Sequence, residues 1–257
     1  MGSSDIKVHE FNHLKNYSNI VHGIFARSGG TSRGKFDSLN IGMNSGDKES
    51  VVADNRKLII KKMGMKPFIF LNQVHGTQIK ILKKASNNLS ENFQSGKKAY
   101  TADGIITDIK DVFLVIQVAD CQAVVLYDHE NQVIANIHSG WRSSVENIIG
   151  KCVAKMISEF GCNPDNIIAG ISPSLGPCCS EFVNYKDEIP EGLWKFKIED
   201  KDYFDFWEMS CDQLMDKGIK KANIENMEIC TRCNMDKFYS YRGEKTTGRF
   251  ACVISMV

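Results

Sequence analysis

Apolar residues recur along this chain in short runs that predict strands, and fewer, longer periodic segments predict helices. The runs are mostly four to seven residues long. They are rich in β-branched and aromatic residues, which is typical of buried strands. In chain order they read IVHGIF, FIFL, TQIKIL, DGIIT, VFLVIQV, AVVLYD, QVIANIH, NIIAGIS and RFACVISMV. Strands this numerous predict a core built on a sheet.

The clearest helical pattern follows the seventh run. Residues 144–160 place apolar side chains at the i, i+3, i+4 and i+7 spacing of one buried stripe. Ser143 followed by Glu146 fits a capping box, and Gly161 fits a C-terminal stop. Shorter helical patterns cover residues 51–63 and 207–217. Strands mixed with helices predict an α/β (mixed α+β) fold with a mixed sheet covered by helices.

The length allows one large domain or two small ones, and no long linker divides the chain, so we expect a single domain over residues 1–257 with a less regular N-terminal segment at 1–19. The polar stretch from Lys83 to Tyr100 is expected to be an exposed loop inside that domain, since apolar runs continue on both sides.

Composition excludes some classes of protein. Lys and Arg total 32 and Asp and Glu total 31, and this balance argues against a general binder of nucleic acid or membrane surfaces. No apolar run approaches the roughly 20 residues that cross a bilayer. The first residues lack the apolar core of a signal peptide, and the nine cysteines show no disulfide framework. We therefore expect a cytoplasmic protein with mostly free thiols.

Two consecutive strand runs place a thiol beside an imidazole. AVVLYD and QVIANIH, joined by HEN, are expected to form a hairpin, in which the start of the first strand lies beside the end of the second. Cys121 precedes the first run and His138 ends the second. His75, between two other strand runs, is a candidate third member. Two histidines and one cysteine suit zinc with a fourth position left for water, although either residue type alone is more often a buried core residue.

Arginines near turns are candidate contacts for an anion. Arg27 and Arg33 lie in a Gly/Ser-rich loop, Arg142 lies at the expected helix start, and Arg242 and Arg249 flank the turn before the last strand. Each of these patterns also fits a solvated surface loop.

The remaining cysteine patterns are weaker. Cys230 and Cys233 form a C-x-x-C pair for which the sequence offers no partner pair at zinc-finger spacing. GPCCSE resembles a deaminase motif only superficially, because its spacing differs and no upstream H-x-E occurs.

Taken together, the motifs FARSGGTSRG, SLNIG, DNR, NQVHGT, ADGIITD, VADC, HSGWRSS and YSYR resemble the YfiH/YlmD family over about residues 20–257. That family was long labelled polyphenol oxidase or laccase-like and is now understood as purine nucleoside phosphorylases that also deaminate adenosine and cleave methylthioadenosine. The resemblance implies a single mixed α/β domain with metal ligands at His75, Cys121 and His138.

The resemblance also implies zinc as the metal, with copper as the alternative, and inosine, adenosine and methylthioadenosine as substrates together with phosphate. Catalysis is then expected at the same three residues, and phosphate binding at Arg27, Arg142, Arg242 and Arg249. We expect a monomer or homodimer with no nucleic-acid or membrane partner.

Other functions of the same residues stay open. Cys121 and His138 could be the nucleophile and base of a cysteine hydrolase. Two histidines and a cysteine could also hold one copper ion in a polyphenol oxidase. Six histidines without an H-x-H pair are too few for a multicopper cluster. A binding protein without catalysis is less favoured, because packing alone does not require Gly, Arg, Cys and His at so many element ends.

Overall fold

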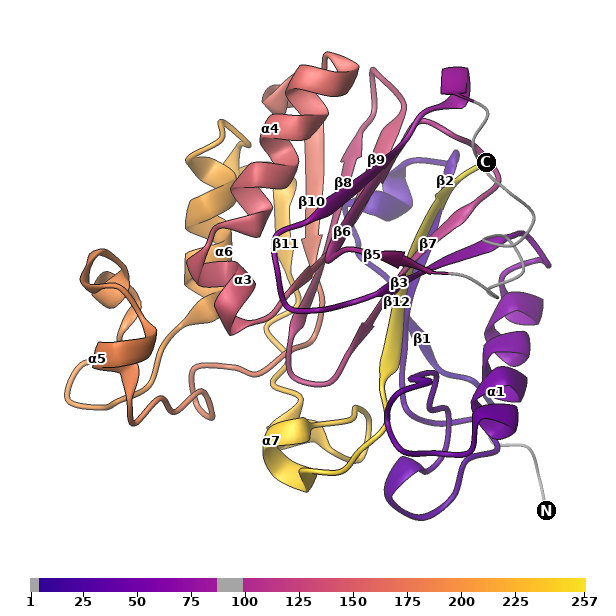
Figure 1. Ribbon diagram of the computed structural model, residues 1–257. Helices are drawn as coiled ribbons and strands as arrows, with labels where there is room; N and C mark the ends of the chain where they lie inside the picture. Colours follow the sequence, from indigo (N-terminus) through magenta and orange to yellow (C-terminus); the bar gives the residue numbers. More distant parts are fainter. Residues whose placement is uncertain (1–4, 87–98) are drawn as a thin grey trace.

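The computed structural model describes residues 5–86 and 99–257, and two six-stranded sheets packed against each other form its centre (Figure 1). The strands of the first sheet are, in order, β1 (Val8–His9), β2 (Ile20–Phe25), β12 (Phe250–Met256), β7 (Phe113–Val118), β3 (Phe68–Asn72) and β5 (Tyr100–Thr101). Those of the second are β11 (Ile224–Asn226), β10 (Ile167–Ile171), β8 (Gln122–Asp128), β9 (Val133–Ser139), β6 (Gly104–Thr107) and β4 (Ile79–Leu82).

Both sheets are mixed. Strand β3 runs parallel to β5 and β7, β4 runs parallel to β6, and β10 runs parallel to β11, whereas the other neighbours are antiparallel. All nine predicted strand runs are confirmed, and so is the mixed α/β fold class. The strands divide between two sheets, and the sequence pattern did not reveal this division.

Helices cover the outer face of each sheet (Figure 1). The α-helices are α1 (Glu49–Lys62), α3 (Trp141–Val145), α4 (Ile148–Phe160), α5 (Tyr185–Glu188), α6 (Phe206–Met215) and α7 (Tyr241–Glu244). Short 3-10 helices span Leu14–Asn16, Gly34–Phe36, Lys84–Ser86, Pro164–Asn166, Glu191–Phe196, Lys221–Asn223 and Arg232–Asn234. Among the described residues, no helix is long and apolar enough to cross a membrane.

Strand β8 contributes side chains to two hydrophobic cores, one on each of its faces. Val124 and Leu126 pack with the buried side of α4, while Val125 and Tyr127 pack into the core between the sheets. This is the two-residue alternation of a strand with both faces buried. A third core lies between α1 and the outer face of the first sheet. The result is a layered order of helix, sheet, sheet and helix.

The predicted helix over residues 144–160 is two helices. Asn147 adopts a left-handed backbone conformation with φ of 56°, which ends α3, and its side chain accepts a hydrogen bond from the Gly150 N–H to start α4. The capping box proposed for Ser143 and Glu146 is wrong, because α3 begins after Gly140 and Ser143 Oγ bonds the Gly140 backbone. The stop at Gly161 is confirmed.

The other helix predictions are close to the observed bounds, since α1 and α6 overlap the predicted segments at residues 51–63 and 207–217. Most of the polar stretch between Lys83 and Tyr100, predicted to be a loop, lies outside the described residues.

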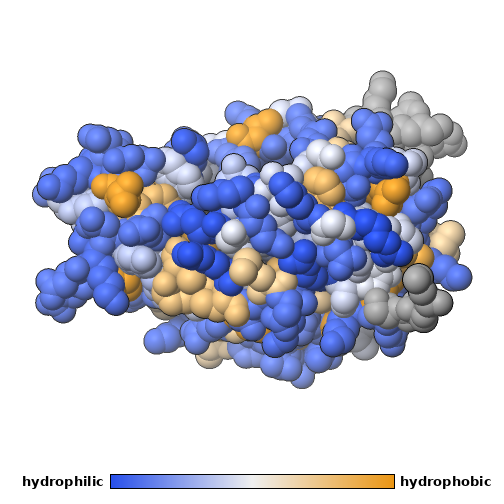
Figure 2. All heavy atoms as spheres, turned by 90° about the horizontal axis from the view of Figure 1, so that it is seen from below, coloured by the Kyte–Doolittle hydropathy of each residue, from blue (hydrophilic) through white to orange (hydrophobic). Residues whose placement is uncertain are grey.

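Seen from below, the face that carries α7 is mostly hydrophilic, with moderately hydrophobic residues gathered near its middle (Figure 2).

Candidate active site

The predicted hairpin is confirmed and brings the expected thiol and imidazole together. Strands β8 and β9 pair antiparallel with Ala123 opposite His138, so Cys121 lies at the same end of the hairpin as that imidazole. His75 joins them from the loop after β3, with Nε2 3.9 Å from Cys121 Sγ and its ring edge-on to the ring of His138. The ligand atoms of the three residues all lie within 4.8 Å of one another.

Asp103, immediately before β6, organises this trio. Its fully buried carboxylate accepts a hydrogen bond from His138 Nδ1 at 2.8 Å. It also accepts bonds from the backbone N–H groups of Val74, His75 and Gly76. One carboxylate therefore orients the His138 ring and holds the turn that carries His75, whose φ is 59°. A carboxylate behind a ligand histidine is a common arrangement at metal sites, because it sets the tautomer and ring orientation.

The electrostatics of the trio favour a thiolate beside an imidazolium when no metal is present. Burial opposes ionisation of Cys121, but attraction and hydrogen bonding from His138 and His75 lower its pKa to about 6. Burial likewise opposes the charge on His138, but the Cys121 sulfur and the Asp103 carboxylate raise its pKa to about 9. The pKa of Asp103 is held down, against its burial, chiefly by His138.

The trio fits a metal ion. His138 uses Nδ1 on Asp103, which leaves Nε2 as the donor atom, and two imidazole nitrogens with one thiolate are suitable ligands for zinc or copper. Gly140 leaves room for this arrangement. A Cβ on Gly140 would lie 2.9 Å from His75 Cδ2 and 3.1 Å from Cys121 Sγ. The donor set does not by itself identify the metal.

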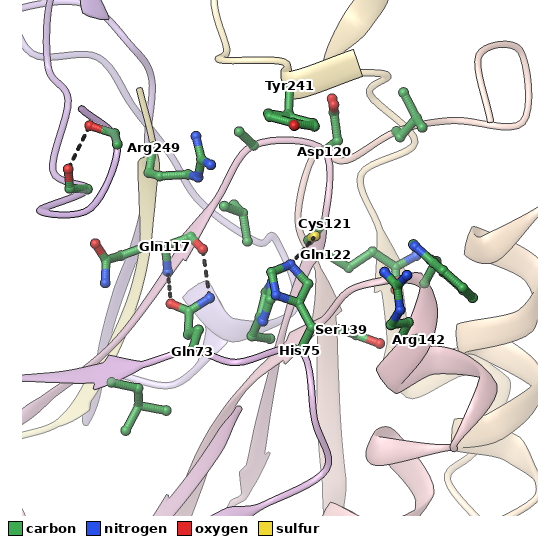
Figure 3. A pocket seen from close by; sticks show the side chains of 18 of the residues that line it. Gln73, His75, Gln117, Asp120, Cys121, Gln122, Ser139, Arg142, Tyr241 and Arg249 are labelled. Carbon is green, nitrogen blue, oxygen red and sulfur yellow. Dashed lines mark hydrogen bonds between the residues drawn. The ribbon is translucent and has the colours of Figure 1, made fainter. Parts of the chain in front are cut away.

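A pocket of about 790 Å³ opens above the trio, and His75, Cys121 and His138 all line it. In the close view, Arg249 and Arg142 lie on opposite sides of His75 and Cys121, with Tyr241 and Asp120 along another wall (Figure 3). The volume is in the range of pockets that hold a small organic ligand.

The structure places some of the predicted arginines at the pocket and one of them outside it. Arg142, Arg242 and Arg249 line the pocket, and Arg142 is exposed with its guanidinium stacked on the Trp141 ring. Arg27 does not line it. Its side chain instead bonds the carbonyls of Asp37 and Met235 and forms an ion pair with Glu244. These bonds tie Arg27 to the surrounding loops, outside the set of residues that line the pocket.

Sequence reasoning missed Asp103 and also two residues that line the pocket, Arg56 and Gln73. Arg56 of α1 bonds Gln117 Oε1, stacks on the Phe70 ring and has its pKa lowered to about 10 by burial. Gln73 pairs through its side-chain amide with the backbone of Gln117. Arg56, Gln73 and Asp103 lie in the motifs DNR, NQVHGT and ADGIITD, which carry the family resemblance. The spacing of these three residues gave no chemical reason to assign them a role in the site.

The expectation that Cys230 and Cys233 lack a partner pair is wrong. Cys178 and Cys179, in the loop after β10, lie beside them, and the four sulfur atoms are all within 4.8 Å of one another. The pairing was hidden because the two segments meet only through tertiary structure.

Comparison with known proteins identifies the family. A family model described as multi-copper polyphenol oxidoreductase laccase matches residues 21–257, and the chain belongs to this family. A purine nucleoside phosphorylase of Bacteroides thetaiotaomicron is 29% identical over 250 residues, covering 93% of this chain and 92% of the relative. The purine nucleoside phosphorylase YlmD of Bacillus subtilis is 27% identical, covering 94% of this chain and 90% of the relative.

Solved structures give the same result. The crystal structure of Bacillus licheniformis hypothetical protein YfiH matches with a TM-score of 0.84 at 28% identity and covers 93% of both chains. The structure of YlmD from Geobacillus stearothermophilus matches with a TM-score of 0.82 at 27% identity, covering 93% of this chain and 92% of that one. The resemblance to the YfiH/YlmD family and its fold are thereby confirmed.

Proposed function

We propose that this protein is a purine nucleoside phosphorylase with a zinc ion held by His75, Cys121 and His138. The substrates are inosine, adenosine and methylthioadenosine, and adenosine is also deaminated. The observation that carries the proposal is a metal-ligating trio in a pocket that is also lined by arginines. The names of the relatives from Bacteroides and Bacillus support the same reaction class.

The pocket has the size and chemistry for a nucleoside together with phosphate. Among the described residues, the Arg142 side chain has no hydrogen-bond partner within the protein, so its guanidinium is available to an anion. Arg249 uses Nη1 on the carbonyls of Thr247 and Gly248 and keeps its other donors for a ligand. Trp141 and Phe182 meet edge-to-face at the pocket wall and present aromatic surface for a purine.

In this reaction a phosphate oxygen forms a bond to ribose C1′ while the bond from C1′ to purine N9 breaks, and the base leaves with the bonding electrons. Arg142 and Arg249 bind and orient the phosphate, and their positive charges favour the anion in the pocket. Asp103 keeps His138 and His75 in place through the contacts described above. Zinc bound by the trio would supply Lewis-acid catalysis and the activation of water needed for deamination.

One observation favours a second candidate, a cysteine hydrolase. Cys121, His138 and Asp103 are arranged as thiol, imidazole and carboxylate, and the pKa of Cys121 is lowered. In that case Cys121 attacks the substrate directly and no metal is needed. Mapping of iodoacetamide modification separates the two candidates, because Cys121 is shielded from alkylation only when it binds zinc.

The experiment is to incubate the purified protein with each nucleoside, with and without phosphate, and to separate the products by chromatography. We expect free purine and a ribose 1-phosphate only when phosphate is present, and conversion of adenosine to inosine without it. Cys121→Ala should abolish both reactions, and the matched control Cys211→Ala, which removes a thiol on α6, should not. Base release that does not depend on phosphate would refute the phosphorylase.

A further inference from the structure

Four cysteines converge in a second cluster that the proposed reaction does not use. Cys178 and Cys179 come from the loop after β10, and Cys230 and Cys233 flank the start of the 3-10 helix at Arg232–Asn234. Cys233 Sγ lies 3.6 Å from Cys178 Sγ and 3.6 Å from Cys179 Sγ. All four sulfurs lie within 4.8 Å of one another.

These distances fit metal ligands better than disulfides. A disulfide requires sulfur atoms about 2.05 Å apart, and all nine cysteines of the chain are free. Zinc holds thiolates at about 2.3 Å in a tetrahedron, which places neighbouring sulfurs about 3.8 Å apart. The sulfur separations seen at Cys233 are close to that edge length.

Hydrogen bonding around Cys230 also favours a bound thiolate. The backbone N–H groups of Gly176 and Cys233 bond its sulfur, and hydrogen bonds of this kind stabilise a thiolate. A divalent cation bound by the cluster would compensate the charge of all four thiolates.

We propose that Cys178, Cys179, Cys230 and Cys233 bind one zinc ion in a closed four-thiolate site, separate from the trio in the pocket. With four protein ligands the tetrahedron is complete, so the site is structural and does not carry out chemistry. It closes a long loop, since Cys178 and Cys233 are 55 positions apart in the chain.

The site's position indicates what the zinc stabilises. Thr231, inside the C-x-x-C pair, donates a hydrogen bond to Asp120 at 2.7 Å, and Asp120 is the neighbour of Cys121. The Cys179 carbonyl accepts a bond from Arg242, which lines the pocket. The bridge between Ser174 and Cys230 joins the two cysteine segments directly. Zinc here would stabilise the pocket wall. It would affect Arg242 and Asp120 only by fixing their positions.

The test starts from the Cys121→Ala variant, so that metal in the trio does not contribute. We expect this full-length variant, purified under reducing conditions, to hold one zinc ion per chain by elemental analysis. X-ray absorption at the zinc edge should show four sulfur neighbours at about 2.3 Å. Because the readout is metal content and ligand type, it is independent of whether the protein is a phosphorylase.

Variants in the same background locate the ion. Adding Cys233→Ser or Cys178→Ser should lower zinc occupancy at least about tenfold against a competing chelator, since even substitutions behind the ligands cost that much affinity. Adding Cys211→Ser, a thiol outside the cluster, should leave it unchanged. No zinc in Cys121→Ala, iron in its place, fewer than four sulfurs at the ion, or a disulfide among the four cysteines would each overturn the proposal.

Discussion

The two cysteine-containing clusters of this protein are built from different parts of the fold. The trio of His75, Cys121 and His138 lies where strands end and faces a large pocket, and a buried carboxylate stands behind one imidazole. The four-cysteine cluster lies in two loops, offers only sulfur, and has Cys178 and Cys233 exposed. Three ligands beside a pocket leave room for a substrate, whereas four thiolates leave none. Ligand number and position are therefore the basis on which we propose a catalytic role for the first cluster and a structural role for the second.

The largest expected effect comes from removing the cysteine of the trio while the four-cysteine cluster stays intact. Cys121→Ala should abolish nucleoside cleavage and metal binding at the trio, because the remaining two imidazoles hold zinc weakly. Activity assays and elemental analysis measure the two effects. If the variant kept full activity, catalysis would not depend on the trio, and the roles that we propose for the two clusters would be wrong.

Asp103→Asn tests the carboxylate that the four-cysteine cluster lacks. The amide retains the shape but loses the charge that fixes His138, so we expect metal affinity at the trio to fall by about 10- to 100-fold. Zinc at the four cysteines should be unaffected. Metal titration in the presence of a chelator measures both, and equal losses at both clusters would indicate a general loss of folding instead.

Gly140→Ala tests how tightly the trio is packed. The new Cβ would press on His75 and Cys121, and overpacking of this kind costs about 1–3 kcal/mol. We expect the cost to appear as weaker metal binding. Gly192→Ala is the matched control, because a Cβ there meets nothing within 4 Å. Unchanged metal affinity in Gly140→Ala would mean that the trio tolerates displacement.

The smallest effects should separate two arginines that looked alike in the sequence. Arg142→Ala should raise the KM for phosphate about tenfold, as expected for one lost charge-assisted contact, with the free energy of unfolding unchanged. Arg27→Ala should instead lower the free energy of unfolding by about 1–2 kcal/mol, since it loses its bonds to Asp37, Met235 and Glu244. Phosphate kinetics and urea denaturation measure these outcomes, and the reverse result would exchange the two roles.

Local patterning in the sequence determined most of the secondary structure and the core of the site. Short apolar runs rich in β-branched residues identified β8 and β9, and antiparallel pairing then required Cys121 and His138 to meet at one end of the hairpin. His75 was recognised by its residue type and by family resemblance. The break between α3 and α4 was missed because Asn147 ends a helix through its backbone conformation, which the apolar stripe does not encode.

Only the tertiary structure decided which distant segments meet. Asp103 bonds residues from two different strand ends, and the loop after β10 brings Cys178 and Cys179 to Cys230 and Cys233. Hydrophobic periodicity describes the face that an element buries, but it contains no information about which polar side chains of remote loops will converge. Those contacts depend on how the two sheets pack and where their connecting loops return, so they follow from the assembled fold.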